Sequence, residues 1–315
     1  MTFINWSALK NPVYSRRWWS VKDAAMVYHD SQFYLFFSAF YWDRFKIRSH
    51  VVEVSTKDWH TFSSPILHID GREDGWTGLC SPDVSKIGDH YYLVYNSWGA
   101  KHPNGKHNWL FYQSSKDLCQ WSKAKPVGVN LNEDHRVIDI SICHDNSKFY
   151  VIWKDEKYDA GGKKDYKTRM GTCQSLEESL AYIGDGYPKF YLANGQESQD
   201  IHENYQFIQI DGQWHVLTTD YPNHRPILYQ MQGNPAQDES WLQWTNGHEL
   251  VVPQEEFNRH QTANAAFLAD WRAYDGFFYL LYAGRTHDWS FKGRGDNKLG
   301  LVRSKDLKTW KIPPT

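Results

Sequence analysis

Cysteines are scarce in this sequence, and those present form no recognisable pair. The 315 residues include only four, and none belongs to a CxxC pair or has the spacing of a zinc site. We therefore predict free thiols and no cysteine-based metal or redox centre. The four positions are Cys80, Cys119, Cys143 and Cys173.

The sequence also lacks a long apolar run near its start and an excess of one charge. Arg16, Arg17, Lys22 and Asp23 interrupt the first thirty residues, so we predict neither a signal peptide nor a membrane span there. The default location is cytoplasmic, unless a leader was trimmed. Thirty-five basic and 37 acidic residues give a formal net charge of −2. That balance argues against a nucleic-acid partner, which favours clustered Lys and Arg, and the oligomeric state stays open.

Aromatic residues, in contrast, are abundant. Sixteen Trp, 20 Tyr and 16 Phe make up 17% of the chain, and apolar residues make up 41%, which is enough to bury a core. We interpret most of the rings as packing within β-sheets, although flat amphipathic rings also stack on ligands. A chain of this length is compatible with one large all-β domain.

One hairpin pattern recurs five times along the chain. Each copy has an apolar or aromatic run, a polar turn with Asp, Gly or Asn, and a second run. These turn residues tolerate the positive φ of tight hairpins, so each copy predicts two antiparallel strands. The pairs are AAMVY and FYLFFS after Asp23, VSKI and YYLVYNS after Asp83, ISICH and FYVIWK after Asp139, NYQFIQI and WHVLTTD after Glu203, and AAFLADW and FFYLLYAG after Asn264. The five polar residues are spaced by 60, 56, 64 and 61 residues.

A second pattern, a polar turn followed by Trp, marks the outer part of several copies. It reads STKDW at 55–59, SSKDLCQW at 114–121 and SKDLKTW at 304–310. Four strands per copy at a regular period predict an all-β fold, a five-bladed β-propeller with four-stranded antiparallel blades, as a single domain over residues 1–315. A β-sandwich is the alternative, but it gives no reason for the turn chemistry to repeat.

The five polar residues stand at or just before the first strand of each copy. In a propeller these strands are innermost and run in the same direction, so their starting ends meet at one mouth. Asp23, Asp83, Asp139, Glu203 and Asn264 are therefore predicted to converge on one pocket. Crowded carboxylates raise the proton affinity of at least one member, which suits general acid and base chemistry. Taken singly, each residue is as easily explained as a turn or cap residue.

The chain resembles the five-bladed glycosidases of glycoside hydrolase family 43 and its clan neighbours, families 32, 62 and 117. The resemblance rests on VKDAAM, VIDISI and IHENYQF, and on SPDV at 81–84. It implies that Asp23 is the general base, that Asp139 raises the pKa of the acid, and that Glu203 is the general acid. Two departures are Ala24, where the family has Pro, and the Asn-Tyr pair at 204–205, where it has Gly-Pro.

The resemblance also implies an inverting mechanism, and the chemistry of sugar recognition indicates a set of substrate contacts. Inversion calls for carboxyl groups roughly 6.5 to 9.5 Å apart. Sugar hydroxyls favour forked partners and sugar faces favour aromatic planes, so we predict six substrate-binding residues. They are Trp42, Asp83, Trp98, Arg225, Asn264 and Arg285. No cofactor is predicted to be required, although several family members hold an axial calcium or sodium ion through a His where this chain has Asn264.

Three functional classes follow. The first is an exo-acting, inverting glycoside hydrolase that cleaves short oligosaccharides or glycosides of arabinoside or xyloside type. The second is a glycoside phosphorylase on the same scaffold, which needs a cluster of Arg, Lys and His for phosphate. The sequence shows no compact basic motif of that kind. The third is a non-catalytic propeller that binds carbohydrate or protein, which would not need acids on blades one, three and four together.

Overall fold

The computed structural model describes residues 3–98, 108–131, 136–158 and 164–314, and this part of the chain is built almost entirely from β-strands. The one α-helix within these ranges, α1 (Arg272–Asp275), has four residues. In these ranges no helix has the length and apolar character that a membrane span requires. All four cysteines are free thiols, as predicted.

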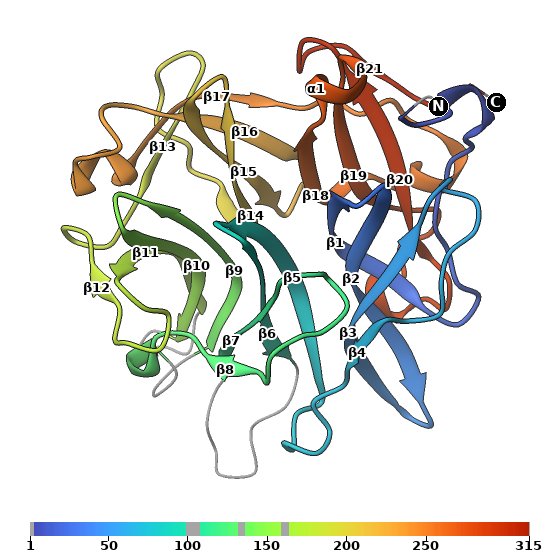
Figure 1. Cartoon of the computed structure of the whole chain (residues 1–315), viewed down its shortest axis with the longest axis horizontal. Coiled ribbons are helices and arrows are strands. Elements are labelled where there is room, and N and C mark those ends of the chain that lie inside the picture. Colours follow the sequence, from blue (N-terminus) through green and yellow to red (C-terminus); the bar gives the residue numbers. More distant parts are fainter. Residues whose placement is uncertain (1–2, 99–107, 132–135, 159–163, 315) are drawn as a thin grey trace.

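The strands fall into five consecutive groups that surround a common centre (Figure 1). Groups one and two share one sheet, which is joined by a single parallel pair between Ser49 and Gly78. Group one has β1 (Ser20–His29), β2 (Gln32–Asp43), β3 (Lys46–Thr56) and β4 (Leu67–Ile69), and group two has β5 (Gly78–Ile87), β6 (His90–Trp98), β7 (Leu110–Ser115) and β8 (Lys125–Pro126).

The other three groups are separate sheets. Group three has β9 (Arg136–Asp145), β10 (Lys148–Tyr158), β11 (Lys164–Cys173) and β12 (Ala181–Tyr182); group four has β13 (Lys189–Leu192), β14 (Ile201–Ile210), β15 (Gln213–Tyr221), β16 (Pro226–Met231) and β17 (Gln243–Glu249); group five has β18 (Gln261–Asp270), β19 (Phe278–Arg285), β20 (Asn297–Ser304) and β21 (Trp310–Lys311). Group four departs from the predicted pattern because it has a fifth strand, β13, which runs parallel to β17. Elsewhere in these three sheets, neighbouring strands are antiparallel.

Each of the five predicted hairpins is present, and each begins its group except in group four, where β13 comes first. The first strands of the five hairpins lie nearest the centre in Figure 1; they are β1, β5, β9, β14 and β18. All five pair antiparallel with the strand that follows. The alternation of apolar residues therefore predicted the hairpins correctly, because the strand period of two puts every second side chain on the same face.

The repeated polar turn is a local hydrogen-bond motif. The Asp58 carboxylate accepts hydrogen bonds from the backbone N–H groups two and three residues later, at 2.8 Å each. Asp117 and Asp306 do the same at 2.8–2.9 Å. This Asx-turn geometry explains why Asp recurs at the same place in the turn. The residues after it, Trp59, Leu118 and Leu307, have positive φ.

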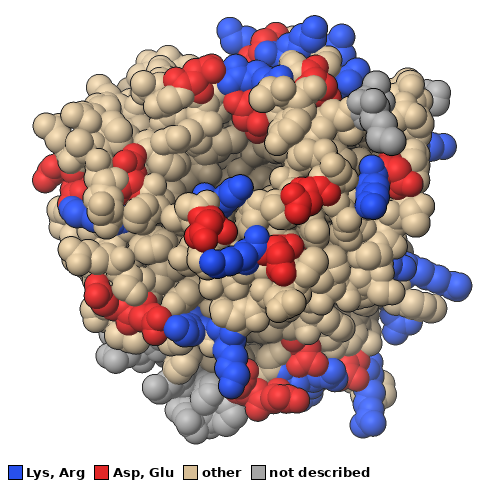
Figure 2. All heavy atoms as spheres, in the orientation of Figure 1, with Lys and Arg blue, Asp and Glu red and all other residues tan. Residues whose placement is uncertain are grey.

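Most aromatic rings are packing residues, as predicted. Trp153, Trp241 and Trp244 are fully buried, and Tyr150 stacks on Trp241 with ring centroids 3.8 Å apart. The N-terminal segment joins the last group, because Tyr14 and Leu299 exchange backbone hydrogen bonds of 3.3 and 2.9 Å. On the face seen in Figure 2, acidic and basic side chains are interspersed and form no area of a single sign.

Candidate active site

Every innermost strand carries a β-bulge at the same place. The pairing with the second strand shifts so that two residues oppose one, and the first bulged residue has positive φ in all five cases. These residues are Asp23, Ser81, Asp139, Asn204 and Ala265. A bulge bends its strand and redirects the side chains near it, so five equivalent bulges turn five pairs of residues toward the centre.

Except for Ala265, the bulged residues and the residues just before them line a central cavity of about 440 Å³. Asp23, Asp139, Glu203 and Asn264 all belong to this lining, which confirms that these four converge on one pocket. Each is the third or fourth residue of its strand and not the first. The strands therefore begin earlier than predicted. The prediction missed their first residues because the bulge interrupts the alternation of apolar and polar side chains on which it was based.

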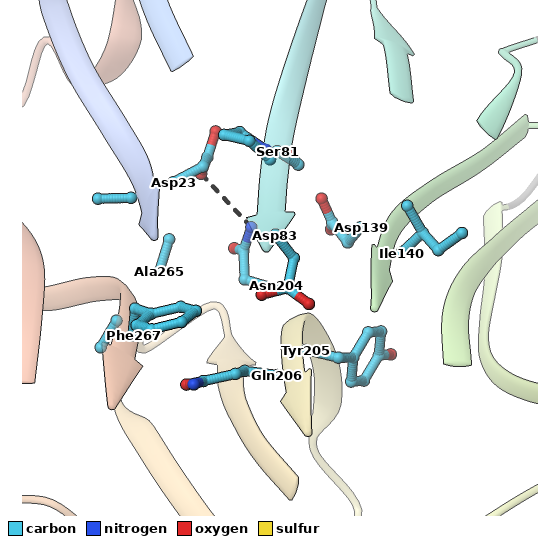
Figure 3. Close-up of a pocket in the computed structure, with 13 residues that line it drawn as sticks. Asp23, Ser81, Asp83, Asp139, Ile140, Asn204, Tyr205, Gln206, Ala265 and Phe267 are labelled. Carbon is cyan, nitrogen blue, oxygen red and sulfur yellow. Dashed lines mark hydrogen bonds between the residues drawn. The ribbon is translucent and has the colours of Figure 1, made fainter. Parts of the chain in front are cut away.

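Asp23 is buried and has two polar neighbours in the cavity. Its Oδ1 lies 3.0 Å from Lys22 Nζ and accepts a hydrogen bond of 3.4 Å from Asn204 Nδ2. Figure 3 shows this second contact, which joins strands β1 and β14 across the centre. Asn204 stands where the family has Gly, and its amide orients the Asp23 carboxylate.

Asp139 is buried, with 6% of its surface exposed, and its backbone N–H donates a hydrogen bond of 3.0 Å to Asn96 Oδ1. Burial raises the pKa of its carboxyl to about 6, and the neighbouring Glu203 carboxylate adds to the rise. A carboxyl with this pKa shares a proton with its surroundings close to neutral pH. Of Asp139 and its neighbour Glu203, Asp139 is therefore the one that more readily holds a proton.

Glu203 is bound by a buried cation that the sequence did not reveal. Lys154 Nζ on β10 lies 2.9 Å from Glu203 Oε2 and 3.6 Å from Glu156 Oε1. The same ammonium sits over the rings of Tyr166 and Tyr221, at 4.7 and 5.4 Å from their centroids. A cation held between carboxylates and ring faces is strongly fixed in place.

This contact reverses one electrostatic prediction. Burial by itself would raise the pKa of Glu203, but the ammonium groups of Lys154 and Lys22 outweigh it and hold that pKa below its usual value. Asp139 was expected to keep Glu203 protonated. Instead, the raised pKa belongs to Asp139 and the lowered pKa to Glu203. The reason is proximity, because Lys154 donates directly to Glu203.

Asp83 lies deeper than the other predicted acids. It lines a narrow channel of about 20 Å³ below the cavity, together with Asp23 and Asp139, but it is not part of the wide cavity. Figure 3 shows these side chains around the channel. On β5 the bulge falls on Ser81, so Asp83 is two residues, roughly 7 Å, further along the strand. Its Oδ2 accepts a hydrogen bond of 2.6 Å from Ser141 Oγ, and burial raises its pKa to about 7.

Three of the predicted substrate-binding residues line the cavity. Asn264 is buried, and its Oδ1 is directed to no hydrogen-bond partner in the described part of the chain. Arg285 has a similarly unpartnered Nε, while its Nη2 lies 3.1 Å from Asp288 Oδ1. Trp98 packs edge-on against Phe40 and Phe291 at 5.2 and 5.4 Å. Free polar groups beside an aromatic wall are suited to a sugar.

The other two, Arg225 and Trp42, lie outside the cavity lining. Arg225 makes a forked contact to Asp220 and also approaches Glu249 and Asp200, so its guanidinium is already engaged by carboxylates. Trp42 lines a neighbouring hollow, in which its Nε1 donates to the backbone carbonyl of Lys292 at 2.8 Å.

Sequence reasoning missed most of the basic side chains of the cavity. Lys22, Arg136, Lys154 and His224 line it, and they come from strands or loops of groups one, three and four. The position of Lys154 at the end of a predicted strand was the signal that could have identified it. In an antiparallel hairpin the end of the second strand lies beside the start of the first, so Lys154, directly after the apolar run FYVIW, was placed to reach the mouth.

The described residues offer little to a metal ion. No three His, Cys, Asp or Glu side chains among them are grouped so that they could hold one. In the central channel Asp83 Oδ1 lacks a hydrogen-bond partner, but Gln206 is committed to the backbone of Leu268, and calcium takes about six to eight oxygens. The axial calcium or sodium ion stays a prediction, and no chemical step is assigned to it.

Comparisons with known proteins agree on the fold. No family model and no curated protein sequence matches the chain. An α-L-arabinofuranosidase from Lactobacillus brevis has a TM-score of 0.65 at 11% identity, covering 97% of both chains. A GH43_1 enzyme from Xanthomonas citri, solved with xylotriose, has a TM-score of 0.64 at 13% identity, covering 97% of this chain and 93% of that one. A glycosyl hydrolase from Bacteroides ovatus has a TM-score of 0.63 at 13% identity, covering 96% and 94%.

This chain shares their fold. The resemblance to family 43 glycoside hydrolases is thereby confirmed for the architecture, over nearly the whole chain. Identities this low transfer neither a substrate nor a residue's role, because one scaffold hosts many functions. What the site does must therefore be argued from its own geometry.

Proposed function

We propose that this chain is a glycoside hydrolase whose five strand groups are the blades of a five-bladed β-propeller. The support is the five equivalent bulges, which place two residues from almost every group in one cavity. The single observation that carries the function is that Asp23, Asp139 and Glu203, from three groups, line that cavity together. Carboxylates in one cavity are the reagents that hydrolyse a glycosidic bond.

In this proposal Glu203 donates a proton to the leaving glycosidic oxygen, and Asp23 accepts a proton from the attacking water. Before substrate binds, the proton that Glu203 will donate resides mainly on Asp139, whose pKa is raised to about 6. The two carboxyls interact, so they titrate as a pair and not as separate groups. Asn204 orients Asp23, and Lys154 orients Glu203.

The substrate class that the site best supports is a short oligosaccharide or glycoside of arabinoside or xyloside type, cleaved from its end with inversion. The cavity, at about 440 Å³, is near the small end of ligand pockets, which suits one or two sugar units. The free Asn264 Oδ1 and Arg285 Nε offer an acceptor and a donor for hydroxyls. Similar structures include an arabinofuranosidase and an enzyme solved with xylotriose.

A panel of aryl glycosides tests the proposal. Release of the aryl group from at least one arabinoside, xyloside or related glycoside is expected, and Glu203→Gln should abolish it while leaving the folded structure intact. Exposed Glu256→Gln is the matched control and should retain full activity. A panel without any turnover contradicts the proposal and favours the non-catalytic sugar-binding alternative. An active Glu203→Gln variant contradicts the role of Glu203 as the general acid.

The basic side chains of the cavity favour one second candidate, a glycoside phosphorylase. Lys22, Arg136, Lys154, His224 and Arg285 are the kind of cluster that a phosphate co-substrate needs, although most of them pair with a carboxylate in the same cavity. Inorganic phosphate discriminates between the two. Phosphate-dependent turnover with a sugar phosphate as product supports phosphorolysis, and turnover that phosphate leaves unchanged supports hydrolysis.

A further inference from the structure

Three exposed tryptophans lie beside the cavity, and the proposed chemistry does not use them. Trp18, Trp42 and Trp289 are 56%, 39% and 57% exposed. Trp42 and Trp289 line one hollow of about 570 Å³, and Trp18 is connected to it through Arg294, whose guanidinium carbon lies 5.6 Å from the ring centroid. We call these three residues the tryptophan platform. Exposed aromatic groups gathered in one place mark a binding surface.

The two rings in the hollow are held in fixed orientations. Trp42 Nε1 donates to the Lys292 carbonyl at 2.8 Å. Trp289 stacks on the His287 ring with centroids 4.4 Å apart and an interplanar angle of 11°, so one face is covered and the other is left exposed. His287 Nδ1 is itself 3.1 Å from Asp296 Oδ1. Rings that are already positioned lose little conformational entropy when a flat ligand stacks on them.

The close packing around Trp289 depends on a glycine. A Cβ at Gly293 would lie 2.8 Å from the Trp289 Cβ and 2.6 Å from the Asp296 Cβ. Only a residue without a side chain lets this segment fold so tightly against the ring. The platform is therefore supported by its own loop.

The platform is flanked by cations without acidic partners. Arg17, Lys292 and Arg294 form no ion pair with any carboxylate in the described ranges. Arg17 and Arg294 instead lie over Trp18, at 4.8 and 5.6 Å from its ring centroid. This contrasts with the cavity, where most cations pair with an acid. Unpaired guanidinium and ammonium groups are free to bind carboxylate or sulfate oxygens.

The platform is continuous with the cavity. Asp288 lines both hollows, and it pairs with Arg285 of the cavity at 3.1 Å. The short segment Ser290–Lys292 follows, with Phe291 in the cavity wall and Lys292 in the platform hollow. A chain whose terminal sugar occupies the cavity would therefore leave it across the tryptophan platform.

We propose that the tryptophan platform binds the sugar units that follow the cleaved bond, and that these units carry oxyanion substituents. The apolar faces of the sugars stack on Trp42 and Trp289, and carboxylate or sulfate groups on the same chain bind Arg17, Lys292 and Arg294. This rests on the proposed glycosidase function and names the substrate class as acidic oligosaccharides. Aryl monosaccharides are then poor substrates compared with longer acidic chains.

A saccharide explains these observations better than a nucleic acid does. Single-stranded nucleic acids also bind aromatic and basic groups, but they need a basic groove that follows several phosphates. Here Lys292 and Arg294 line one hollow that also contains Asp288, and Arg17 lies over the nearby Trp18. The adjoining cavity has five acidic residues, and the whole chain has a formal net charge of −2. Repulsion at the cavity would oppose a polyanion that runs through it, whereas one or two charges outside the mouth are accommodated.

The first experiment measures affinity in matched pairs on the full-length chain. The Glu203→Gln variant is used so that the ligand is not turned over during calorimetry. One comparison is xylotriose with xylotriose that bears a glucuronic acid. The other is galactotriose with trigalacturonate and with a sulfated galactotriose. We expect the acidic member of at least one pair to bind about ten-fold more tightly at 50 mM salt, and the difference to fall below about three-fold at 500 mM because salt screens exposed charges. The carboxylated and sulfated arms identify the oxyanion.

The second experiment uses variants and chain length. Trp289→Ala and Trp42→Ala should each raise the KM of the best acidic trisaccharide at least five times more than that of the aryl monosaccharide. The Arg17→Ala/Arg294→Ala double variant should remove the preference for the acidic member. Tyr274→Ala, with a ring equally exposed at 56%, and Lys116→Ala are the matched controls and should change neither quantity.

The outcomes separate the two proposals. Tight, platform-dependent binding of an acidic trisaccharide without turnover by the wild-type chain supports the platform and contradicts the glycosidase. Turnover of aryl glycosides with equal affinity for neutral and acidic chains, or with no effect of the Trp variants, overturns the platform and leaves the glycosidase standing. Equal competition by an oligothymidylate for the platform overturns the assignment to saccharides.

Discussion

Lys154 Nζ lies 2.9 Å from Glu203 Oε2, and this buried ion pair joins the second strand of group three to β14, the innermost strand of group four. The pair sets the charge of the proposed general acid. Glu203 is ionised more readily than an ordinary glutamate because Lys154 stabilises its carboxylate. The proposed chemistry therefore favours acidic pH, at which the Asp139–Glu203 pair still holds a proton.

Removing that cation should move the pH profile. Lys154→Met takes away the positive charge, so the pKa of Glu203 rises, and the alkaline limb of kcat/KM moves to higher pH, by about one unit or more. The sign follows because the general acid must be protonated to work. Lys148→Met, which removes a lysine paired with Asp238 at the surface, is the control. A limb that stays in place would show that Glu203 is not the titrating acid.

Loss of either proposed catalytic carboxyl should stop hydrolysis. We expect Asp23→Asn and Glu203→Gln each to lower kcat by about 10² to 10⁴, which is the usual contribution of a positioned acid or base. Circular dichroism should match that of the wild type, since both replacements keep the side-chain shape. Residual activity above one tenth in either variant would remove that residue from the mechanism.

The stereochemistry of the product is a separate prediction. A single displacement by water inverts the anomeric centre, so proton NMR of the first product formed should show the opposite anomer to the substrate. Spectra must be recorded before mutarotation is complete. Product of unchanged configuration would indicate a covalent glycosyl intermediate, with Asp23 as nucleophile instead of base.

Glu53 should make stability depend on pH independently of the active site. It is fully buried, accepts a hydrogen bond of 2.8 Å from Trp121 Nε1, and burial raises its pKa from 4.5 to about 8. Because the folded state holds the proton more tightly, stability is highest below the unfolded pKa and is lost as pH rises through about 8. Ionisation of the buried carboxyl costs on the order of 5 kcal/mol, because each unit of pKa shift corresponds to about 1.4 kcal/mol.

Glu53→Gln tests this. The variant should melt at a higher temperature than the wild type at pH 9, and the difference should shrink or reverse at pH 6, where the wild-type carboxyl is neutral. Exposed Glu178→Gln is the control and should follow the wild type at both pH values. If the melting temperatures of wild type and variant differ by the same amount at both pH values, the raised pKa of Glu53 is contradicted.

The five hairpins and their turns could be predicted because the signals are local. Alternation of apolar residues in a strand and the Asp of a turn such as Ser115–Gln120 act over a few neighbours, so the sequence displays them directly. The bulges could not be predicted in the same way. They interrupt the alternation, and this is why Asp83 was placed at the mouth while the bulge of β5 falls on Ser81.

The amino-acid sequence by itself determined which strands form, how they pair along the chain, and that acids stand near the inner end of three of them. Only the tertiary structure decided that Asp23, Asp139 and Glu203 share a cavity, that Lys154 binds Glu203, and that Arg225 is held elsewhere by Asp220. The physical reason is the separation along the chain over which each interaction acts. Hydrogen bonding and side-chain alternation act between near neighbours, whereas the charges that set a pKa come from residues brought together only when the sheets pack around one centre.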